Sequence, residues 1–249
     1  MKTSNKILTL ASLVCIAYLV IYDTALKAEF VKGDFKKPHY KMQQLSLGNF
    51  NAIEHNAANI IGMQVEKGPF RVWIADRIKD KIKISQHGQT LQVDYISKEN
   101  FNDYRGIIIS CPDVISITAS PFINSEQNTG GRYLRKNGNS MIIDYFQHGT
   151  ISVTGFNQPV MTLQAGEFTE FELEKNTLGQ LNATIGDSKK GNAGLTINSD
   201  NKITAANLQV PGKSTLTLDN VTIDKVISKM ADSADVRLTG KSVHLLDRP

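Results

Sequence analysis

The sequence predicts an all-β protein whose second half is a parallel β-solenoid with about 21 residues per coil. Three observations support this fold class. Apolar-x-apolar pairs recur at regular intervals, a two-residue step follows each pair, and no amphipathic helical pattern occurs after residue 30. The chain has 249 residues, 41% of them hydrophobic and 21% charged, which is enough for a sizeable core.

The apolar pairs begin 20, 24, 21 and 20 residues apart, which sets the period of the coil. Alternation with period two places both members of a pair on one face of a strand. Coils that return to the same phase stack these pairs into an apolar ladder. The five pairs are Ile151/Val153, Phe171/Leu173, Leu195/Ile197, Leu216/Leu218 and Val236/Leu238.

The step after each pair is expected to bend the chain at a coil corner. Four steps contain residues typical of turns, namely Thr154-Gly155, Asn198-Ser199, Asp219-Asn220 and Thr239-Gly240, whereas Glu174-Lys175 does not. An antiparallel sandwich of short strands shows similar turn signals and is the alternative. Further apolar residues are expected to complete the core: Val160, Met161, Leu163, Leu181, Ala183, Ile185, Leu208, Val210, Val226 and Ile227.

The first half of the predicted domain, residues 46–125, reads as shorter and less regular strands. Residues 63–74 and 82–95 each predict strand, turn, strand, with Gly68-Pro69 and His87-Gly88 at the turns. Residues 106–120 predict a strand pair bent at Pro112. The polar stretch 124–140 is expected to be a long exposed loop or a joint before the regular coils of residues 141–249. Buried positions are expected at Val65, Val72, Ile84 and Val93.

The chain begins with a segment that predicts export or membrane anchoring. Lys2 and Lys6 precede sixteen uncharged residues, 7–22, which span roughly 24 Å as a helix. A cleavage site after Ala28 would give a secreted protein, but Leu26 fits the small-x-small pattern poorly. We therefore favour an uncleaved anchor over residues 1–28, a basic linker over 29–45 and an extracytoplasmic, periplasmic domain over 46–249.

Net charge argues against a nucleic-acid partner. The leader to Ala28 holds three of the 28 basic residues and one of the 24 acidic ones, which leaves +2 for the rest of the chain. The chain has two cysteines. Cys15 lies in the leader and only Cys111 lies outside it, so the sequence allows no intramolecular disulfide in the domain. We interpret Cys111 as a small buried hydrophobic residue.

The layout resembles the auto-transporter adhesin head GIN domain family (DUF2807) of Bacteroidetes. The stretches that carry the resemblance are "FNAIEHNAANIIGMQVEKG", "IIISCPDVISITAS" and "SADVRLTGKSVHLL", within residues 46 to about 246. The resemblance implies an extracytoplasmic, right-handed β-helix. It supplies no catalytic residues.

The sequence offers little catalytic chemistry, and we assign no catalytic, cofactor-binding or metal site. Asp219, Asp235 and Arg237 form the one acid and base group that could serve a carbohydrate-active β-helix, but they are interpreted as solubilising charges near the last coil. Gly212-Lys213-Ser214 and Gly240-Lys241-Ser242 resemble half a phosphate loop, but each is expected to turn a corner into a strand.

Two other patterns are interpreted in the same structural way. Residues 199–202, "SDNK", superficially match elements of penicillin-binding enzymes but are expected to form a coil corner. The histidines His39, His55, His87, His148 and His244 lack metal-ligand spacing.

The sequence therefore favours a non-catalytic, adhesin-like envelope module that presents a β-surface to a glycan or a protein. The alternatives are a β-helix lyase or hydrolase and a membrane-anchored signalling or structural partner in the periplasm.

Overall fold

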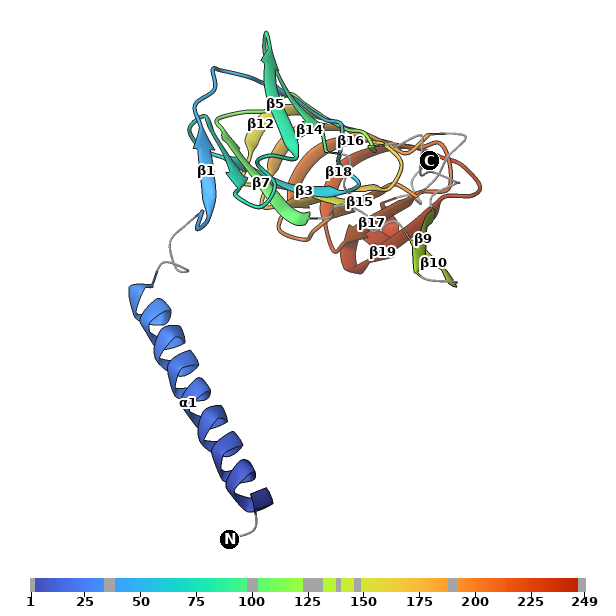
Figure 1. Ribbon diagram of the computed structural model, residues 1–249. Helices are drawn as coiled ribbons and strands as arrows, with labels where there is room; N and C mark the ends of the chain where they lie inside the picture. Colours follow the sequence, from blue (N-terminus) through green and yellow to red (C-terminus); the bar gives the residue numbers. More distant parts are fainter. Residues whose placement is uncertain are drawn as a thin grey trace. The chain divides into compact units, whose positions relative to one another are not determined.

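The computed structural model describes residues 3–33, 39–97, 103–122, 132–137, 140–145, 149–187 and 192–245. The chain divides into two compact units, Met1–Met42 and Gln43–Pro249. The first unit contains helix α1, Thr3–Lys32, which runs four residues past the predicted boundary at Ala28 (Figure 1). By length and composition its segment Asn5–Lys32 is apolar enough to cross a membrane.

The second unit consists mainly of two large β-sheets. Sheet A has nine strands in the order β1-β4-β7-β3-β11-β13-β15-β17-β19, and sheet B has eight in the order β18-β16-β14-β12-β8-β2-β6-β5. The strands of sheet A are β1 Met42–Leu45, β4 Arg71–Ala75, β7 Asp103–Cys111, β3 Ile61–Lys67, β11 Gly149–Thr154, β13 Thr169–Glu174, β15 Gly194–Ile197, β17 Thr215–Asp219 and β19 Asp235–Thr239. Those of sheet B are β18 Thr222–Met230, β16 Lys202–Val210, β14 Thr177–Ile185, β12 Asn157–Ala165, β8 Ser116–Ala119, β2 Ala52–His55, β6 Thr90–Tyr95 and β5 Ile82–His87.

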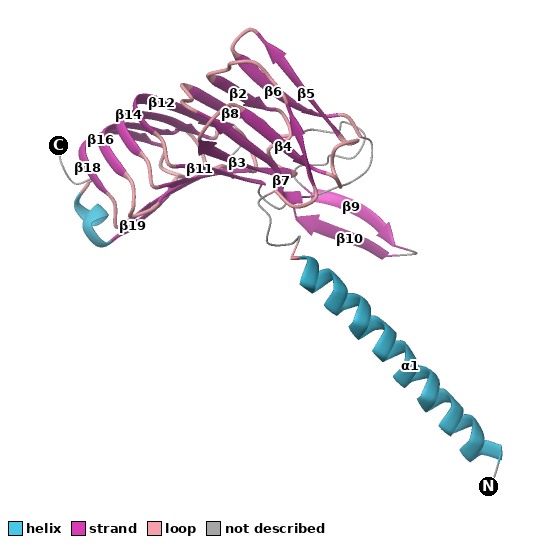
Figure 2. Cartoon of the chain, turned by 90° about the vertical axis from the view of Figure 1, so that its left-hand side faces the viewer, coloured by secondary structure: helices cyan, strands magenta, loops and turns pink. Residues whose placement is uncertain are grey.

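From β11 onward the chain alternates between the two sheets, one strand in each, and neighbouring strands within a sheet are parallel. Parallel pairing rules out the antiparallel sandwich for this half of the domain. Figure 2 shows the strands of sheet B side by side. A short 3₁₀ helix, η2 Gly240–His244, follows β19.

The predicted ladder is confirmed pair by pair. Ile151 pairs with Phe171, Phe171 with Leu195, Leu195 with Leu216, and Leu216 with Val236, and the second member of each pair follows the same register. The side chains of the first four pairs are at most 1% exposed. Val236 and Leu238 are only half-buried, because β19 is an edge strand with no further rung beyond it.

The intervening apolar residues are mostly buried, with two errors. Val160 is 41% and Ile227 58% exposed. Successive strand residues point to opposite faces, so Val160 cannot share the inward direction of Met161, nor Ile227 that of Val226. The prediction was wrong because it placed both residues of each adjacent apolar pair, Val160/Met161 and Val226/Ile227, in the core.

The corners show how the coils turn. Gly155, Asn220 and Gly240 adopt φ of 81°, 49° and 55°, and Lys175, the corner without turn chemistry, adopts 55°. The Lys175 backbone N–H donates to Asp200 Oδ1 at 3.0 Å, a contact from the next coil that stabilises this conformation.

Buried asparagines next to the corners form hydrogen bonds with backbone groups of neighbouring coils. Asn176 and Asn201 are 1% and 3% exposed, and the Asn176 backbone N–H donates to Asn201 Oδ1 at 3.0 Å. Asn176 Oδ1 in turn accepts from the Phe156 N–H at 3.0 Å. These amides satisfy backbone groups that the bend removes from the sheets.

The first half follows the predicted strands but pairs them in a different way. Val65, Val72 and Val93 are fully buried, while Ile84 is half-buried on the edge strand β5. β3 and β4 do not pair with each other, because β7 lies between them. β7 ends at Cys111 and β8 begins at Ser116 in the other sheet, so the bend at Pro112 is confirmed.

Part of the stretch 124–140, which the sequence predicts to be a long exposed loop or a joint, is a strand. β9 Arg132–Asn137 pairs antiparallel with β10 Ser140–Tyr145 as a hairpin. Residues 124–131 and 138–139 of that expectation lie outside the described residues.

Candidate functional site

The structure does not bring Asp219, Asp235 and Arg237, the one acid and base group found in the sequence, together in a catalytic site. Asp235 pairs with Thr215 while Asp219 pairs with Thr239, so the two carboxylates lie four residues apart along the strands, roughly 13 Å. That separation exceeds the distance of up to roughly 9.5 Å used by paired catalytic carboxylates. Arg237 Nη2 is 2.8 Å from Asp235 Oδ2, and Asp219 Oδ1 accepts from Thr239 Oγ1 at 2.5 Å.

The two phosphate-loop-like fragments serve the backbone. Ser214 Oγ accepts from the Ala193 N–H at 3.2 Å, and Ser242 Oγ accepts from the Val221 N–H at 2.9 Å. Gly212-Lys213-Ser214 runs into β17 as expected, but the expectation of a strand after Gly240 is wrong. Gly240-Lys241-Ser242 opens η2, because Ser242 turns inward to bond Val221 in the corner of the previous coil.

The remaining candidates are also structural. In "SDNK", Asp200 and Asn201 make the corner contacts described above. Burial raises the pKa of the Cys111 thiol to about 12, so it is an inert core residue as predicted. No cluster of three or more His, Cys, Asp or Glu that could hold a metal occurs among the described residues, which exclude His148.

Sequence analysis missed the role of His55, which is completely buried on β2. Its Nε2 lies 2.8 Å from the Ile61 carbonyl oxygen, and burial lowers its pKa to about 4. A neutral imidazole that donates from Nε2 fits this contact. His55 therefore joins β2 to β3 and has no access to a ligand.

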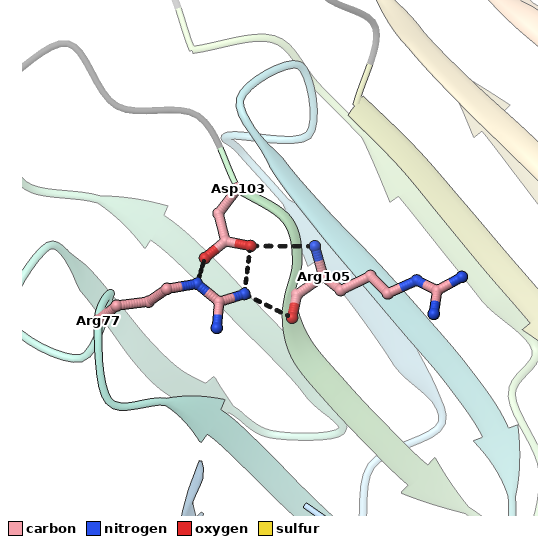
Figure 3. A network of polar contacts seen from close by, with 3 residues as sticks. All are labelled: Arg77, Asp103 and Arg105. Atoms are coloured by element: carbon pink, nitrogen blue, oxygen red, sulfur yellow. Dashed lines mark hydrogen bonds and ion pairs between the residues drawn. The ribbon is translucent and has the colours of Figure 1, made fainter. Parts of the chain in front are cut away.

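Sequence analysis also missed an ion pair between Arg77 and Asp103 (Figure 3). Arg77 binds both carboxylate oxygens, with Nη2 at 2.6 Å from Asp103 Oδ1, and this contact raises the pKa of the guanidinium. The Arg105 N–H donates to the same oxygen at 3.1 Å. Asp103 is 6% exposed at the start of β7, so the pair fastens the segment between β4 and β5 to sheet A.

The outer face of sheet A carries acidic side chains, and several of them accept hydrogen bonds from polar neighbours. Glu170 accepts from Thr196 at 3.3 Å, Glu172 from Asn198 at 3.0 Å, and Glu66 from Gln64 at 2.9 Å. With the Asp219 and Asp235 contacts, five acidic side chains of this face are engaged with a polar neighbour.

The outer face of sheet B has a different chemistry. On the central strand β8, and from Val160, Gln180 and Ala205 to the ends of the central strands β12, β14 and β16, the outward residues are uncharged, and most carry a hydroxyl or an amide. They are Ser116, Thr118, Val160, Thr162, Gln164, Gln180, Asn182, Thr184, Ala205, Asn207 and Gln209. Their inward neighbours on the central strands, such as Leu163 and Leu208, are buried.

The strand register arranges these residues in straight rows across the sheet. One row is Glu54–Thr118–Gln164–Thr184–Gln209–Lys229, and its neighbour is Ala52–Ser116–Thr162–Asn182–Asn207–Ile227. We call the first the Glu54–Lys229 row. None of its six side chains makes a hydrogen bond or an ion pair to any residue in the described part of the chain. Rungs are ~4.8 Å apart, so this row offers donors and acceptors at regular intervals, while in the neighbouring row Asn182 accepts a hydrogen bond from Gln180 at 3.2 Å.

Comparison with known proteins gives the fold. No model of a known protein family matches the chain, and no curated protein matches it. Its structure is similar to that of a "putative adhesin" from Parabacteroides distasonis, with a TM-score of 0.55 and 10% identity over 79% of this chain and 71% of that one. A "putative adhesin" from Bacteroides fragilis gives 0.50 and 12%, over 80% and 96%. The chain thus shares a fold with these proteins of Bacteroidetes.

Proposed function

We propose that the protein is a non-catalytic binding module of the cell envelope, adhesin-like, and that it binds through the outer face of sheet B. The observation that carries the proposal is the difference between the two outer faces. On sheet A five acidic side chains are engaged with polar neighbours, whereas on sheet B the six side chains of the Glu54–Lys229 row make no hydrogen bond to any described residue. Such groups pair with the hydroxyls of a glycan or with the polar surface of a protein.

Two finer assignments belong to the same proposal. The alternation of parallel strands between two sheets supports a right-handed parallel β-helix over residues 46–249, in keeping with the handedness of parallel crossovers. The shared fold and the three quoted stretches support membership of the GIN domain (DUF2807) family. Helix α1 supports an uncleaved anchor through residues 7–22, with the β domain in the periplasm.

The binding test uses the full-length chain in a mild non-ionic detergent. Immobilised protein is probed with purified bacterial polysaccharides and with the chain itself, and each solution is assayed for released sugars with and without Ca²⁺. We expect binding to at least one analyte and no product. A variant with Thr162→Arg and Asn207→Arg should lose that binding.

The matched control carries Ser152→Arg and Thr217→Arg on the outer face of sheet A and should bind like the native chain. Loss of binding in the control alone, or a released sugar product, would contradict the proposal.

A further inference from the structure

Across the six strands from β2 to β18, the Glu54–Lys229 row carries charge at its two ends and none between, and beyond β2 it continues into the uncharged Gln92 of β6 and Ser85 of β5. In the Glu54–Lys229 row the acidic residue lies on β2 and the basic one on β18, with four uncharged residues, one on each intervening strand, between them. Both charged side chains are exposed and unpaired among the described residues. At ~4.8 Å per rung the two ends lie about 24 Å apart, beyond the ~8 Å over which salt at physiological concentration leaves charges coupled.

The Glu54–Lys229 row is complementary in charge and in hydrogen-bonding groups to a second copy of the same row that runs in the opposite direction. A two-fold axis that runs parallel to the strands, midway between two facing sheets and between Gln164 and Thr184, turns the face over and sets the row against a second copy of itself in the opposite direction. It brings Glu54 of one copy opposite Lys229 of the other, and Lys229 opposite Glu54. The same rotation sets Thr118 opposite Gln209, and Gln164 opposite Thr184, so that each hydroxyl meets an amide.

We propose that the partner of this face is a second copy of the same chain, bound face to face in the opposite direction. The inference rests on the proposed function, because it names the partner for that surface. Two-fold contacts are the usual way in which one surface patch recognises itself. Opposite charges at the ends set the direction, since a parallel arrangement would place Glu54 against Glu54 and Lys229 against Lys229.

The size of the face sets the strength of the contact. It is about 24 Å across the strands and only a few residues wide, which is less than the roughly 800 Å² per partner of a stable complex. A single contact is therefore weak, and vesicles that each carry many copies would be held together by the combined effect of many such contacts.

The test uses full-length protein reconstituted in neutral phosphatidylcholine vesicles, with vesicle aggregation followed by light scattering. Native vesicles should aggregate at low salt and disperse as salt rises, because exposed ion pairs are screened. Glu54→Lys vesicles should not aggregate, and neither should Lys229→Glu vesicles, because each would oppose like charges.

Mixing the two variants provides the decisive arm. A face with two lysine ends complements a face with two glutamate ends, so the mixture should aggregate, as should vesicles with both substitutions in one chain. Glu174→Lys and Lys67→Glu, on the sheet A side of the domain, are the matched controls and should leave aggregation unchanged.

The inference is overturned if native vesicles do not aggregate, or if the mixture stays dispersed while the controls aggregate. The proposed function fails separately. Suppose that the vesicles do not aggregate but that the chain binds a polysaccharide, and that Thr162→Arg with Asn207→Arg removes this binding. The proposed function would then stand, and the second copy would be excluded as the partner. Absence of both kinds of binding would overturn the function as well.

Discussion

Burial of His55 makes the stability of the β domain depend on pH. The imidazole is completely buried, and its pKa in the folded protein is about 4 against 6.5 for an ordinary histidine, mainly because burial disfavours the charged form. The Ile61 and Val93 backbone and the Asp94 carboxylate, on the neighbouring strands, oppose that shift without cancelling it. We therefore predict a loss of stability on acidification.

The sign and the size of the effect follow from proton linkage. Above pH 6.5 both folded and unfolded forms are neutral at this position, so His55 contributes no pH dependence. Between pH 6.5 and about 4 only the unfolded form takes the proton, and the free energy of unfolding falls. At about 1.4 kcal/mol per pH unit the total loss is about 3 kcal/mol, complete below pH 4.

The assay is urea unfolding of the full-length chain in non-ionic detergent at pH 7.5 and 4.5, followed by Trp73 fluorescence. Trp73 is the single tryptophan and is 7% exposed, so it reports loss of the core. His55→Gln keeps a donor for the Ile61 carbonyl but does not titrate, and its stability should fall less on acidification than that of the native chain. His87→Gln, at an exposed histidine, is the control. Equal losses in native and His55→Gln protein would refute the reasoning.

Three further predictions follow from the fold. Leu218 is fully buried between Ile197 and Leu238, so Leu218→Asp should cost several kcal/mol or prevent folding, and an unchanged melting temperature would be inconsistent with the ladder. Full-length protein should stay with membranes after high-salt and alkaline washing, whereas a soluble species that begins at Glu29 would show cleavage. Asp219→Asn and Asp235→Asn should change stability by no more than about 1 kcal/mol and remove no activity; a product from acidic polysaccharide that Asp219→Asn abolishes would point to the enzyme alternative.

The coil repeat could be predicted because its signals are local. Alternation with period two fixes which residues of a strand face inward, and Gly or Asn after the pair fixes the bend, so Ile151 to Leu238 could be aligned without a structure. The same rule explains the errors at Val160 and Ile227, where two adjacent apolar residues were both placed in the core.

The features that were missed depend on residues far apart in the chain. Lys175 has no intrinsic preference for φ of 55°, and Asp200 of the next coil holds it there. Arg77 and Asp103 meet only because β7 inserts between β3 and β4. The binding face could not be predicted either, since it requires the register of six strands of sheet B, from β2 to β18.

The central claim is that the outer face of sheet B is the binding surface, and a cysteine footprint tests it most directly. Single cysteines at Thr184 on sheet B and Thr217 on sheet A are introduced into a Cys15→Ser chain, in which Cys111 remains buried and unreactive. Maleimide labelling is then compared with and without the bound partner, whether a polysaccharide or a second vesicle population. We predict that binding protects position 184 and leaves position 217 reactive. Protection of position 217 alone, or of neither position while binding persists, would contradict the account.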